Sequence, residues 1–456
     1  MAAPISLPPG RVLIALDDGP LVADPTWTRL DDTDNLVSGY DFQVGRQTLI
    51  AQTDTGTATV YLNDTTGDWS PATVMLAGKQ IALQLFNPVT ETWEPQFRGL
   101  IDEVTYDINP ATDADGELIL ANLQIDCVDI FDYLAGYGLT PGLNGVLPPP
   151  TGSEGTIWYA ETSGTIDGRI IEVLTDVGID PDMYVVFSGN VRGREVKYDA
   201  DESALVVLRD ASDAELPFIG NMYPDRYGRF CWHGRESRFD PDTVAAGAGS
   251  GSWDFTRWKA GDGLAINLDA DRAQIRVLSY VRSRADTINA ALAYPKGVAE
   301  ADIPGQVFID ATSIDDYGKH AAQPMTDLLV KAGVTTGNDA NAETLLYATL
   351  LVKNKKDPKL AVSALQVKTI DPADPRADKT WALLSRADIS DIVNLALGDA
   401  GAGTMYALPG DSPDDDHYIE GRAMRVRPLN PGYDYVELDL NLSPAVWSMD
   451  THGVFS

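Results

Sequence analysis

The stretch GTATVYLNDTTGDWSP, residues 56–71, alternates in polarity and then breaks into a polar, acidic run. Ala58, Val60 and Leu62 fall on one side of an extended chain, with threonine and tyrosine side chains on the other. This period of two predicts a half-buried strand, and the run with Gly and Pro that follows it marks a turn. We expect a strand with its apolar face in a β-rich core and a turn that Trp69 fastens.

The same alternation continues on both sides of this strand, through residues 11–135. Strand-like segments follow one another at intervals of about 8–20 residues, separated by Asp, Asn, Gly and Pro, and this spacing predicts an antiparallel barrel or sandwich. We therefore assign a first β-barrel to residues 1–138. Its segments are RVLIAL, YDFQVGRQTLIA, TATVYLN, QIALQLF, EPQFRGLIDEVTYDI and LILANLQIDCVDIF.

A Pro- and Gly-rich break, PGLNGVLPPPTGSEG at 141–155, precedes a different pattern. DGRIIEVLTDVGI has helical spacing, with Asp167 as the predicted N-cap and Gly178 as the stop. ESALVVLRDASDAE predicts a second helix, and NMYPDRYGRFCWHGR predicts a hairpin that turns at residues 225–228. Residues 139–243 are thus expected to form a mixed α/β domain. The apolar residues that carry the two helical patterns are Ile170, Ile171, Leu174, Val177, Leu205, Leu208 and Ala211.

Strand patterns return in the last part of the chain. DRAQIRVLSYVRSRADTINAALAYP is interpreted as a strand pair, and helices are predicted over 320–333 and 341–354, with Asn341 as an N-cap and Pro358 beyond the end. KLAVSALQVKT, HYIEGRAMRVRPL and YVELDLNLSP predict further strands, the last with the apolar face Val436, Leu438, Leu440 and Leu442. We expect a second β-barrel from 253–312 and 358–456, and a helical insertion at 313–357. The predicted fold class is mainly β with α+β parts.

The negative net charge of the chain limits the classes of molecule that it can bind tightly. The chain has 68 acidic and 34 basic residues among 456, a formal charge of −34, and residues 11–135 alone hold 21 acidic and 5 basic residues. A surface this negative repels phosphates, so tight binding of nucleic acid is not expected. The most apolar helical run, LLYATLLV at 345–352, is far below the roughly 20 residues that span a bilayer, so no membrane insertion by this chain is expected.

Residues with catalytic or metal-binding chemistry do not form recognisable motifs. Cys127 and Cys231 lie about a hundred residues apart, which predicts buried free thiols and neither a disulfide scaffold nor a zinc site. The histidines have no partner at catalytic or metal-ligand spacing, and each is interpreted as an isolated surface side chain. We expect no catalytic residues, no cofactor, no metal and no enzyme. The four histidines are His233, His320, His417 and His452.

Two acidic clusters could hold calcium, a question that the sequence leaves open. ATDADGEL at 111–118 contains Asp113-x-Asp115-Gly116, but Ala111 and Asn122 stand where ligands are required, so a hairpin turn is expected. DSPDDDHY at 411–418 is interpreted as a solvated loop; its acids are Asp411, Asp414, Asp415 and Asp416.

One acidic pair, Asp102-Glu103, could in principle act as the two carboxylates of a glycosidase. Among 68 acids such a pair arises easily by chance, so it predicts no activity.

The order of these motifs resembles the minor tail proteins of long-tailed phages that infect actinobacteria, which are similar to the baseplate hub of contractile phages. The resemblance spans most of the chain. It is carried by Gly45-Arg46-Gln47, the strand at 58–63, Trp69-Ser70-Pro71, FRGLIDEV, ESALVVLRDASDAE, YPDRYGRFCW, VRSRADTIN, TSIDDYGKHA and LDLNLSPA.

This resemblance implies a structural protein of the virion, located at the phage tail tip and assembled in the host cytoplasm. The two barrels would be tail-tube-like, and a homotrimer would form a ring that joins the tail tube to the tip. Expected partners are the distal tail protein, the tape-measure protein and other tail-tip proteins, with DNA passing without specific binding. The channel wall is expected to be negative or neutral; the competing arrangement has Arg46 and Arg98 lining it. Alternative functions are a peripheral tail-tip protein that binds host glycan, or a cell-wall hydrolase.

Overall fold

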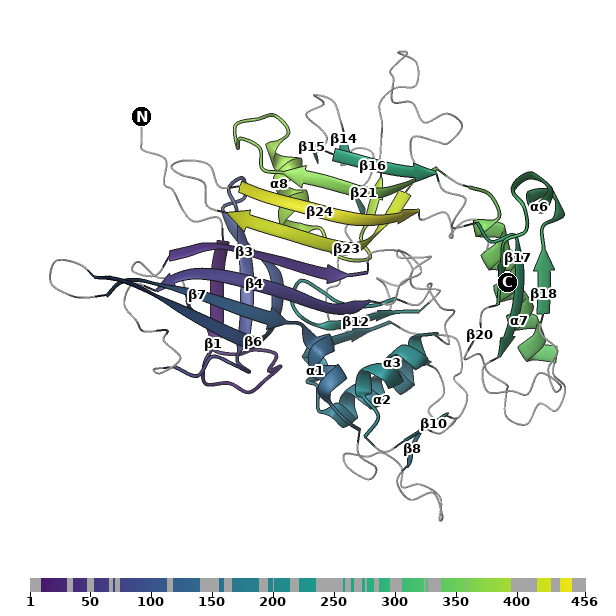
Figure 1. Cartoon of the computed structure of the whole chain (residues 1–456), viewed down its shortest axis with the longest axis horizontal. Coiled ribbons are helices and arrows are strands. Elements are labelled where there is room, and N and C mark those ends of the chain that lie inside the picture. Colours follow the sequence, from purple (N-terminus) through teal and green to yellow (C-terminus); the bar gives the residue numbers. More distant parts are fainter. Residues whose placement is uncertain are drawn as a thin grey trace.

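A computed structural model gives the fold of the chain (Figure 1). A large sheet occupies the centre, helices α1 to α3 lie beside one end of it, and a smaller unit of strands and helices lies apart from it. The structure describes residues 10–30, 36–46, 53–64, 69, 74–112, 118–139, 156–159, 166–187, 196–199, 201–213, 221–234, 257–258, 264–265, 273–274, 277–282, 287–295, 306–323, 325–326, 338–358, 360–394, 416–427 and 435–444.

The first half of the large sheet comes from the N-terminal alternating segments. Its strands are β1 (Gly10–Ala15), β2 (Thr28–Arg29), β3 (Leu36–Gly45), β4 (Asp54–Asp64), β5 (Gln80–Asn87), β6 (Thr92–Thr112) and β7 (Leu118–Val128). Ala58, Val60 and Leu62 of β4 are buried, while the residues between them are exposed or half-buried, so the predicted strand is confirmed. Trp69 is also buried, and its backbone N–H donates to the Asp64 carboxylate at 3.2 Å. The turn at 65–68 lies outside the described residues.

The second half of the large sheet comes from the C-terminal alternating segments. Val436, Leu438 and Leu440 are fully buried and alternate with polar residues, which confirms the predicted apolar face. The strands are β13 (Arg257–Trp258), β16 (Val277–Arg282), β21 (Leu360–Lys368), β22 (Ile392–Asn394), β23 (Asp416–Arg427) and β24 (Tyr435–Pro444).

The two halves form one sheet of 13 strands, because β3 pairs antiparallel with β23. The register runs from Tyr40 opposite Val426 to Gly45 opposite Gly421. The main strand order is β16-β21-β24-β23-β3-β4-β7-β6-β5-β1-β2, and β22 with β13 extends from the other part of β23.

The predicted fold class is confirmed as mainly β with helices, but the described strands do not close into two barrels. The first half curls on itself and stays open in the described residues. The Tyr40 ring of β3 lies against Gly10 of β1, so closely that a Cβ on Gly10 would be 2.5 Å from the ring. The Tyr40 hydroxyl donates a hydrogen bond to the Gln84 carbonyl of β5 at 3.1 Å. This ring occupies the space between β1 and β3, so the two strands approach without pairing.

The mixed segment follows β7. Its elements are α1 (Ile130–Gly136), β8 (Thr156–Tyr159), α2 (Ile166–Val177), η2 (Pro181–Met183), β9 (Tyr184–Val186), β10 (Val196–Asp199), α3 (Ala204–Asp213), β11 (Asn221–Pro224) and β12 (Phe230–His233). Both predicted helices and the hairpin are present, and Gly178 ends α2 at a φ of 82°. Asp167 is not the N-cap, because α2 begins at the buried Ile166 and places Asp167 in its first turn. Ile171 is 38% exposed, because it is the residue after Ile170 on the helix and its side chain therefore points away from the face that Ile170 buries.

The smaller unit is built from β17 (Ala290–Pro295), β18 (Gln306–Ile309), α6 (Ala311–Tyr317), β19 (Ala321–Ala322), β20 (Met325–Thr326) and α7 (Asn338–Lys355). Its core joins Ala291 and Ala293 of β17 to Tyr347 and Leu351 of α7. A separate parallel pair is β14 (Leu264–Ala265) with β15 (Ala273–Gln274).

Three sequence predictions are wrong in this region. β16 and β17 do not pair with each other, because β16 pairs with β21 of the large sheet and β17 with the strands of the smaller unit. Ala321–Ala322 and Met325–Thr326 lie in strands rather than a helix, because they add to β17; residues 324 and 327–337 lie outside the description. α7 begins at Asn338, so Asn341 lies inside the helix and not at its cap, while Pro358 does follow the end.

α8 (Ala377–Arg386) covers the large sheet and belongs to a core shared by both halves. Trp381, Leu383 and Leu384 of α8 are buried in this core together with side chains of β1, β3, β4 and β24. A second core lies under α1, α2 and α3. The division into domains at 1–138, 139–243, 253–312 with 358–456, and 313–357 stays a prediction.

Asp129 ties the mixed segment to the first half of the sheet. It is the fully buried N-cap of α1, and its carboxylate accepts from the Phe131 N–H at 2.8 Å and the Gly56 N–H of β4 at 2.6 Å. Burial raises the pKa of Asp129 to about 7, against the lowering effect of the two N–H donors.

The raised pKa gives Asp129 a pH dependence of known sign. Between its ordinary pKa and about 7, the folded state keeps a proton that the unfolded state loses, so this stabilisation is complete at low pH and is lost as pH rises through about 7. We expect the unfolding free energy of the native protein, relative to Asp129→Asn, to fall between about pH 4 and about pH 7 in urea titrations. A difference that does not change with pH would contradict the assignment.

Candidate functional site

The two cysteines are buried free thiols, as predicted. Burial raises the pKa of Cys127, and it raises the pKa of Cys231 well above the ordinary thiol value. Neither thiol therefore has the lowered pKa of a nucleophile.

The surface interpretation is wrong for two of the histidines. His233 is fully buried: its ring stacks on Phe187 at 4.3 Å between centroids, and its Nε2 shares a 2.7 Å hydrogen bond with the Tyr223 hydroxyl. His417 is buried in β23, because both faces of that strand are covered there. His320 is half-buried, with its backbone N–H bonded to Asn289, and His452 lies outside the described residues.

The acidic clusters give no metal site in the described part of the chain, where no group of three His, Cys, Asp or Glu side chains could hold an ion. Asp102 and Glu103 are exposed on β6, and Asn122 pairs in β7. No described helix is long and apolar enough to cross a membrane. The predicted loop residues outside the description are Asp113, Asp115, Gly116, Asp411, Asp414 and Asp415.

The most distinctive site is the buried seam where β3 meets β23. Arg46, directly after β3, donates its Nε–H to the Glu420 carboxylate at 2.7 Å, and the two side chains are 3% and 1% exposed. The Arg46 backbone N–H also donates to the Glu420 carbonyl at 2.9 Å, and the Ser443 hydroxyl of β24 donates to the same carboxylate. Glu420 is the bulged residue of β23, between the stretch that pairs with β22 and the stretch that pairs with β3.

Glycine permits the close backbone approach at this seam. A Cβ on Gly45, whose φ is +87°, would lie 2.5 Å from the Glu420 carbonyl oxygen, and a Cβ on Gly421 would lie 2.6 Å from the Arg46 carbonyl oxygen. The two strands can therefore come close enough to enclose the ion pair, because each glycine places only a hydrogen atom where another residue would have a Cβ.

A second buried arginine, Arg422 of β23, connects three parts of the molecule. It donates to Asp388 at 2.9 Å and to the Gln96 side chain of β6 at 3.0 Å. Its guanidinium also lies 5.2 Å from the centre of the Phe42 ring of β3. Gln96 in turn donates to the Ser385 carbonyl at the end of α8, so the network links both halves of the sheet to the helix above them.

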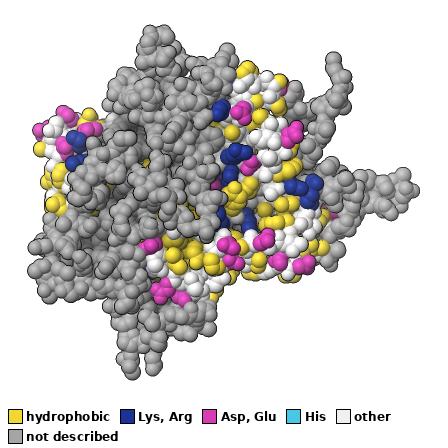
Figure 2. Space-filling model, turned by 180° about the vertical axis from the view of Figure 1, so that it is seen from behind, with side chains coloured by type: hydrophobic (Ala, Val, Ile, Leu, Met, Phe, Trp, Pro, Cys, Tyr) yellow, Lys and Arg dark blue, Asp and Glu magenta, His cyan; other side chains and the backbone are white. Residues whose placement is uncertain are grey.

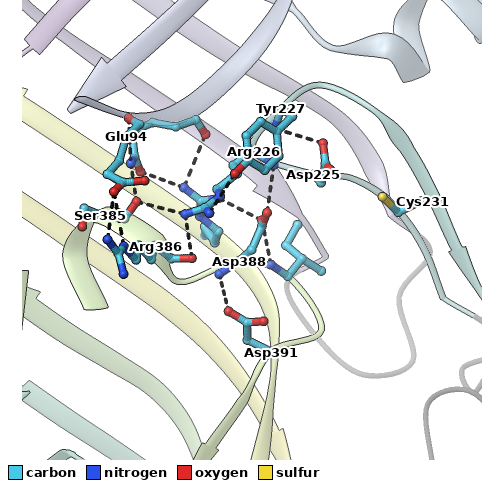
Figure 3. A network of polar contacts seen from close by, with 12 residues as sticks. Glu94, Asp225, Arg226, Tyr227, Cys231, Ser385, Arg386, Asp388 and Asp391 are labelled. Atoms are coloured by element: carbon cyan, nitrogen blue, oxygen red, sulfur yellow. Dashed lines mark hydrogen bonds and ion pairs between the residues drawn. The ribbon is translucent and has the colours of Figure 1, made fainter. Parts of the chain in front are cut away.

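The β11–β12 hairpin inserts Arg226 into the same network (Figure 3). Its backbone N–H donates to Asp388 at 2.9 Å, and its guanidinium donates to the carbonyl oxygens of Ser385 and Arg386 at 3.4 and 3.2 Å. These carbonyls end α8, so a cation from the mixed segment caps a helix of the second half. Asp388 thus joins β23 to the hairpin.

The carboxylates of this network are buried close to one another. Burial, reinforced by the neighbouring Asp388, raises the pKa of Asp391 well above its ordinary value. Burial also raises the pKa of Asp225, against the lowering effect of Arg229, which donates to it at 2.7 Å. The paired arginines and hydrogen bonds fit a structural junction, because they fix three segments at one point.

Neither arginine considered for a channel wall is exposed as a free cation. Arg46 is enclosed at the seam, and Arg98 donates to Gln80 at 2.7 Å and to the carbonyl oxygens of Val22 and Ala23. Burial lowers the pKa of Arg98 to about 10, with Asp225 and Asp24 acting in the opposite direction.

Sequence reasoning missed this junction. The signal was Glu420-Gly421-Arg422, which places two charges around a glycine in the middle of an apolar strand pattern. A matching Gly45-Arg46 ends β3, but only the pairing of strands almost four hundred residues apart brings the two motifs together.

Comparison with solved structures finds this architecture in a known protein. The 43 kDa tail protein of prophage MuSo2 from Shewanella oneidensis matches with a TM-score of 0.51 at 8% identity, covering 96% of this chain and 100% of that chain. The fold is that of a phage tail protein. The resemblance predicted from the sequence is thus confirmed for the fold.

Further matches have lower TM-scores. Prophage tail protein gp18 from Listeria monocytogenes EGD-e gives 0.42 at 10% identity, covering 94% of each chain. The E. coli c3393 protein, a type VI secretion component described as similar to T4 tail proteins gp27 and gp5, gives 0.43 at 9% identity, covering 90% of this chain and 74% of that one. No protein-family description and no curated protein sequence matches the chain. These organisms give no support to the predicted actinobacterial hosts.

The seam predicts a large difference between two acid-to-amide substitutions. Glu420→Gln should lower the unfolding free energy by about 3–5 kcal/mol, because it leaves the Arg46 charge buried without its carboxylate. The matched control is Asp41→Asn, which weakens the half-buried, solvent-accessible Asp41–Arg427 pair and should cost less than about 1 kcal/mol. Urea denaturation measures both, and equal losses would contradict the role of the seam.

Proposed function

We propose that this chain is a structural hub of a phage tail tip, in which a homotrimeric ring joins the tail tube to the tip. The observation that carries the proposal is the similarity of fold, over nearly the whole of both chains, to a prophage tail protein. The fold alone does not determine function, so the buried junction and the charge of the chain supply the further support.

The junction suits a ring that transmits force along the tail. A hub must keep its two halves in a fixed relation while the tail transmits force, and here a continuous backbone ladder, a buried ion pair and a polar network hold the halves together. Arg226 fixes the mixed segment to the same point, so the segments would move as one body.

The two halves of the sheet would act as two tail-tube-like barrels in the assembled particle. Three chains would then offer six similar β units to a six-fold tube, which resolves the mismatch between a three-fold ring and its neighbour. The curled first half, open between β1 and β3, supports this proposal as an incomplete barrel.

The channel of such a ring would be negative or neutral, so that DNA passes without binding to its wall. The formal charge of −34 supports this, and Arg46 and Arg98 are committed to internal contacts. Basic and hydrophobic side chains gather on part of the described back face, with acidic ones around them (Figure 2). We place this mixed face against other tail proteins and not on the channel wall.

The proposed setting is the virion, with the distal tail protein, the tape-measure protein and other tail-tip proteins as neighbours. The chain would be assembled in the host cytoplasm and would act in DNA ejection as a conduit. It would use no cofactor and no metal.

Assembly state tests the hub directly. We expect the purified chain to sediment as a species of about three times its 49.2 kDa mass, because a hub ring closes with three-fold symmetry. Sedimentation velocity across a concentration series measures this mass. A monomer at all concentrations, also in the presence of the tail-tube protein, would contradict the proposal.

Turnover separates the hub from the hydrolase alternative. Since the described cysteines and histidines form no catalytic arrangement, we expect the pure protein to release no more soluble sugar or peptide from host cell walls than a heat-inactivated control. Release above that control would support the hydrolase. Retention of the protein on intact host glycan would instead favour the glycan-binding alternative.

A further inference from the structure

The outer face of strands β1, β2, β5 and β6 carries three arginines. Leu13 of β1 pairs with Arg29 of β2 on one side and with Ala82 of β5 on the other. Ala82 pairs in turn with Arg98 of β6. Residues directly opposite one another in a sheet share a face, so Arg29 and Arg98 lie at the two ends of this row. Arg11 lies two positions before Leu13 and therefore points to the same side.

Aromatic rings pack against these arginines. The Arg11 guanidinium lies 5.0 Å from the centre of the Trp93 ring, and that of Arg98 lies 5.2 Å from the Trp27 ring. Phe86 packs against Trp93 with 5.2 Å between the ring centroids. Figure 2 shows basic and hydrophobic side chains together on this side of the molecule. Tryptophan and arginine carry much of the binding energy at protein interfaces, so this surface has the composition of a docking site. We call it the arginine face; its residues are Arg11, Trp27, Arg29, Phe86, Trp93 and Arg98.

The arginine face is poor in carboxylates, although the chain has a formal charge of −34. β1, β2 and β5 contain no acidic residue. Glu94, the acid in the part of β6 that pairs with β5, is held by Arg386 at 3.2 Å. Arg11 has no acidic partner among the described residues, because its side chain donates to Gln84 at 3.3 Å and stacks on Trp93. A stacked guanidinium keeps N–H groups for a carboxylate, so the face fits an acidic partner.

The far end of β6 has the opposite charge. Residues 101–128, which we call the acidic arm, contain seven acidic residues and no basic one. Asp102, Glu103 and Asp107 are exposed, and none of them has a basic partner in the part of the chain that the structure describes. From residue 102 onward, β6 pairs with β7 alone among the described strands. These carboxylates are therefore accessible to a second molecule.

The two surfaces lie at opposite ends of one strand. From Trp93 to Asp107 an extended strand runs about 46 Å. The acidic arm also projects away from the rest of the large sheet in Figure 1. The arginine face can therefore receive an acidic arm only from another copy of the chain.

We infer that the acidic arm of one copy docks on the arginine face of the next copy. A carboxylate of the arm pairs with Arg11, and the rings of Trp93 and Phe86 exclude water around the pair. Two acidic arms repel each other, and so do two arginine faces, so the contact is head-to-tail. Such contacts close into a ring when the rotation permits. This inference rests on the proposed hub ring, and it identifies the tail protein that covers this face as the next copy of the chain.

Charge reversal tests the contact. Arg11→Glu/Arg29→Glu should weaken assembly at least about ten-fold in sedimentation velocity, because it places like charges opposite each other. Glu103→Lys/Asp107→Lys should weaken assembly from the other surface. The chain with all four substitutions should assemble again, because both surfaces are reversed together.

Two matched controls make the same charge changes on exposed residues of the smaller unit. They are Lys319→Glu/Lys353→Glu and Asp315→Lys/Asp316→Lys, and both should leave assembly unchanged. Circular dichroism melting of each variant separates loss of assembly from loss of folding.

Cross-linking tests the contact without reversing a charge. Thr105 is exposed on the acidic arm, and Val89 is 37% exposed in the turn that joins β5 to β6. When a Thr105→Cys chain is mixed with a Val89→Cys chain, a bismaleimide should join the two, because the native cysteines are buried. A mixture of Thr105→Cys with Lys353→Cys should give only the background of the native chain.

The outcomes separate this inference from the proposed function. If the native chain is a trimer that neither reversed pair weakens, or if the variant with four substitutions stays folded and does not reassemble, the contact is wrong and the hub survives. The same holds if the arginine-face variant keeps the trimer but loses binding to the tail-tube protein. If the native chain forms open rows of copies that the reversals abolish, the contact is supported and the three-fold ring is wrong. A native chain that neither assembles nor cross-links overturns both.

Discussion

The pairing of β3 with β23 is the constraint on which the rest of the structure depends. It turns two groups of strands, separated by almost four hundred residues, into one sheet, and it encloses the Arg46–Glu420 ion pair at the point of contact. A buried ion pair adds little net stability compared with apolar packing, but it strongly penalises any register that leaves one charge alone. At this seam its main effect is therefore to specify which strands meet and at which residue.

The other contacts follow from that register. Arg422 lies one residue past the Gly421 contact and reaches Gln96 and Asp388 only because β3 has brought β6 alongside α8. Arg226 then completes the C-terminal end of α8 from the mixed segment. Since a loss at the seam would expose several buried charges together, we expect its contacts to fail cooperatively.

Local patterns predicted the strands well and their partners poorly. Alternation identified β4 and β24 to within a few residues, and helical spacing identified α2 and α3, because burial of one face produces a periodic pattern of apolar residues in the sequence. Which strands pair depends on contacts between residues far apart in the sequence. The predicted β16–β17 pair was therefore wrong, and the joining of the two halves was not predicted. His233 and His417 were assigned to the surface because their covering neighbours come from other parts of the chain. The junction residues were missed for the same reason, although the fold of a phage tail protein was inferred from the order of weak motifs.

In the proposed function, the joined sheet is the building block of a three-fold tail-tip ring. Electron cryo-microscopy of the assembled chain with the tail-tube protein tests it most directly. We predict a ring of three copies around an open channel, with the β3–β23 seam intact inside each copy. Copies without three-fold symmetry around a channel, or strands β3 and β23 paired between different copies, would contradict it.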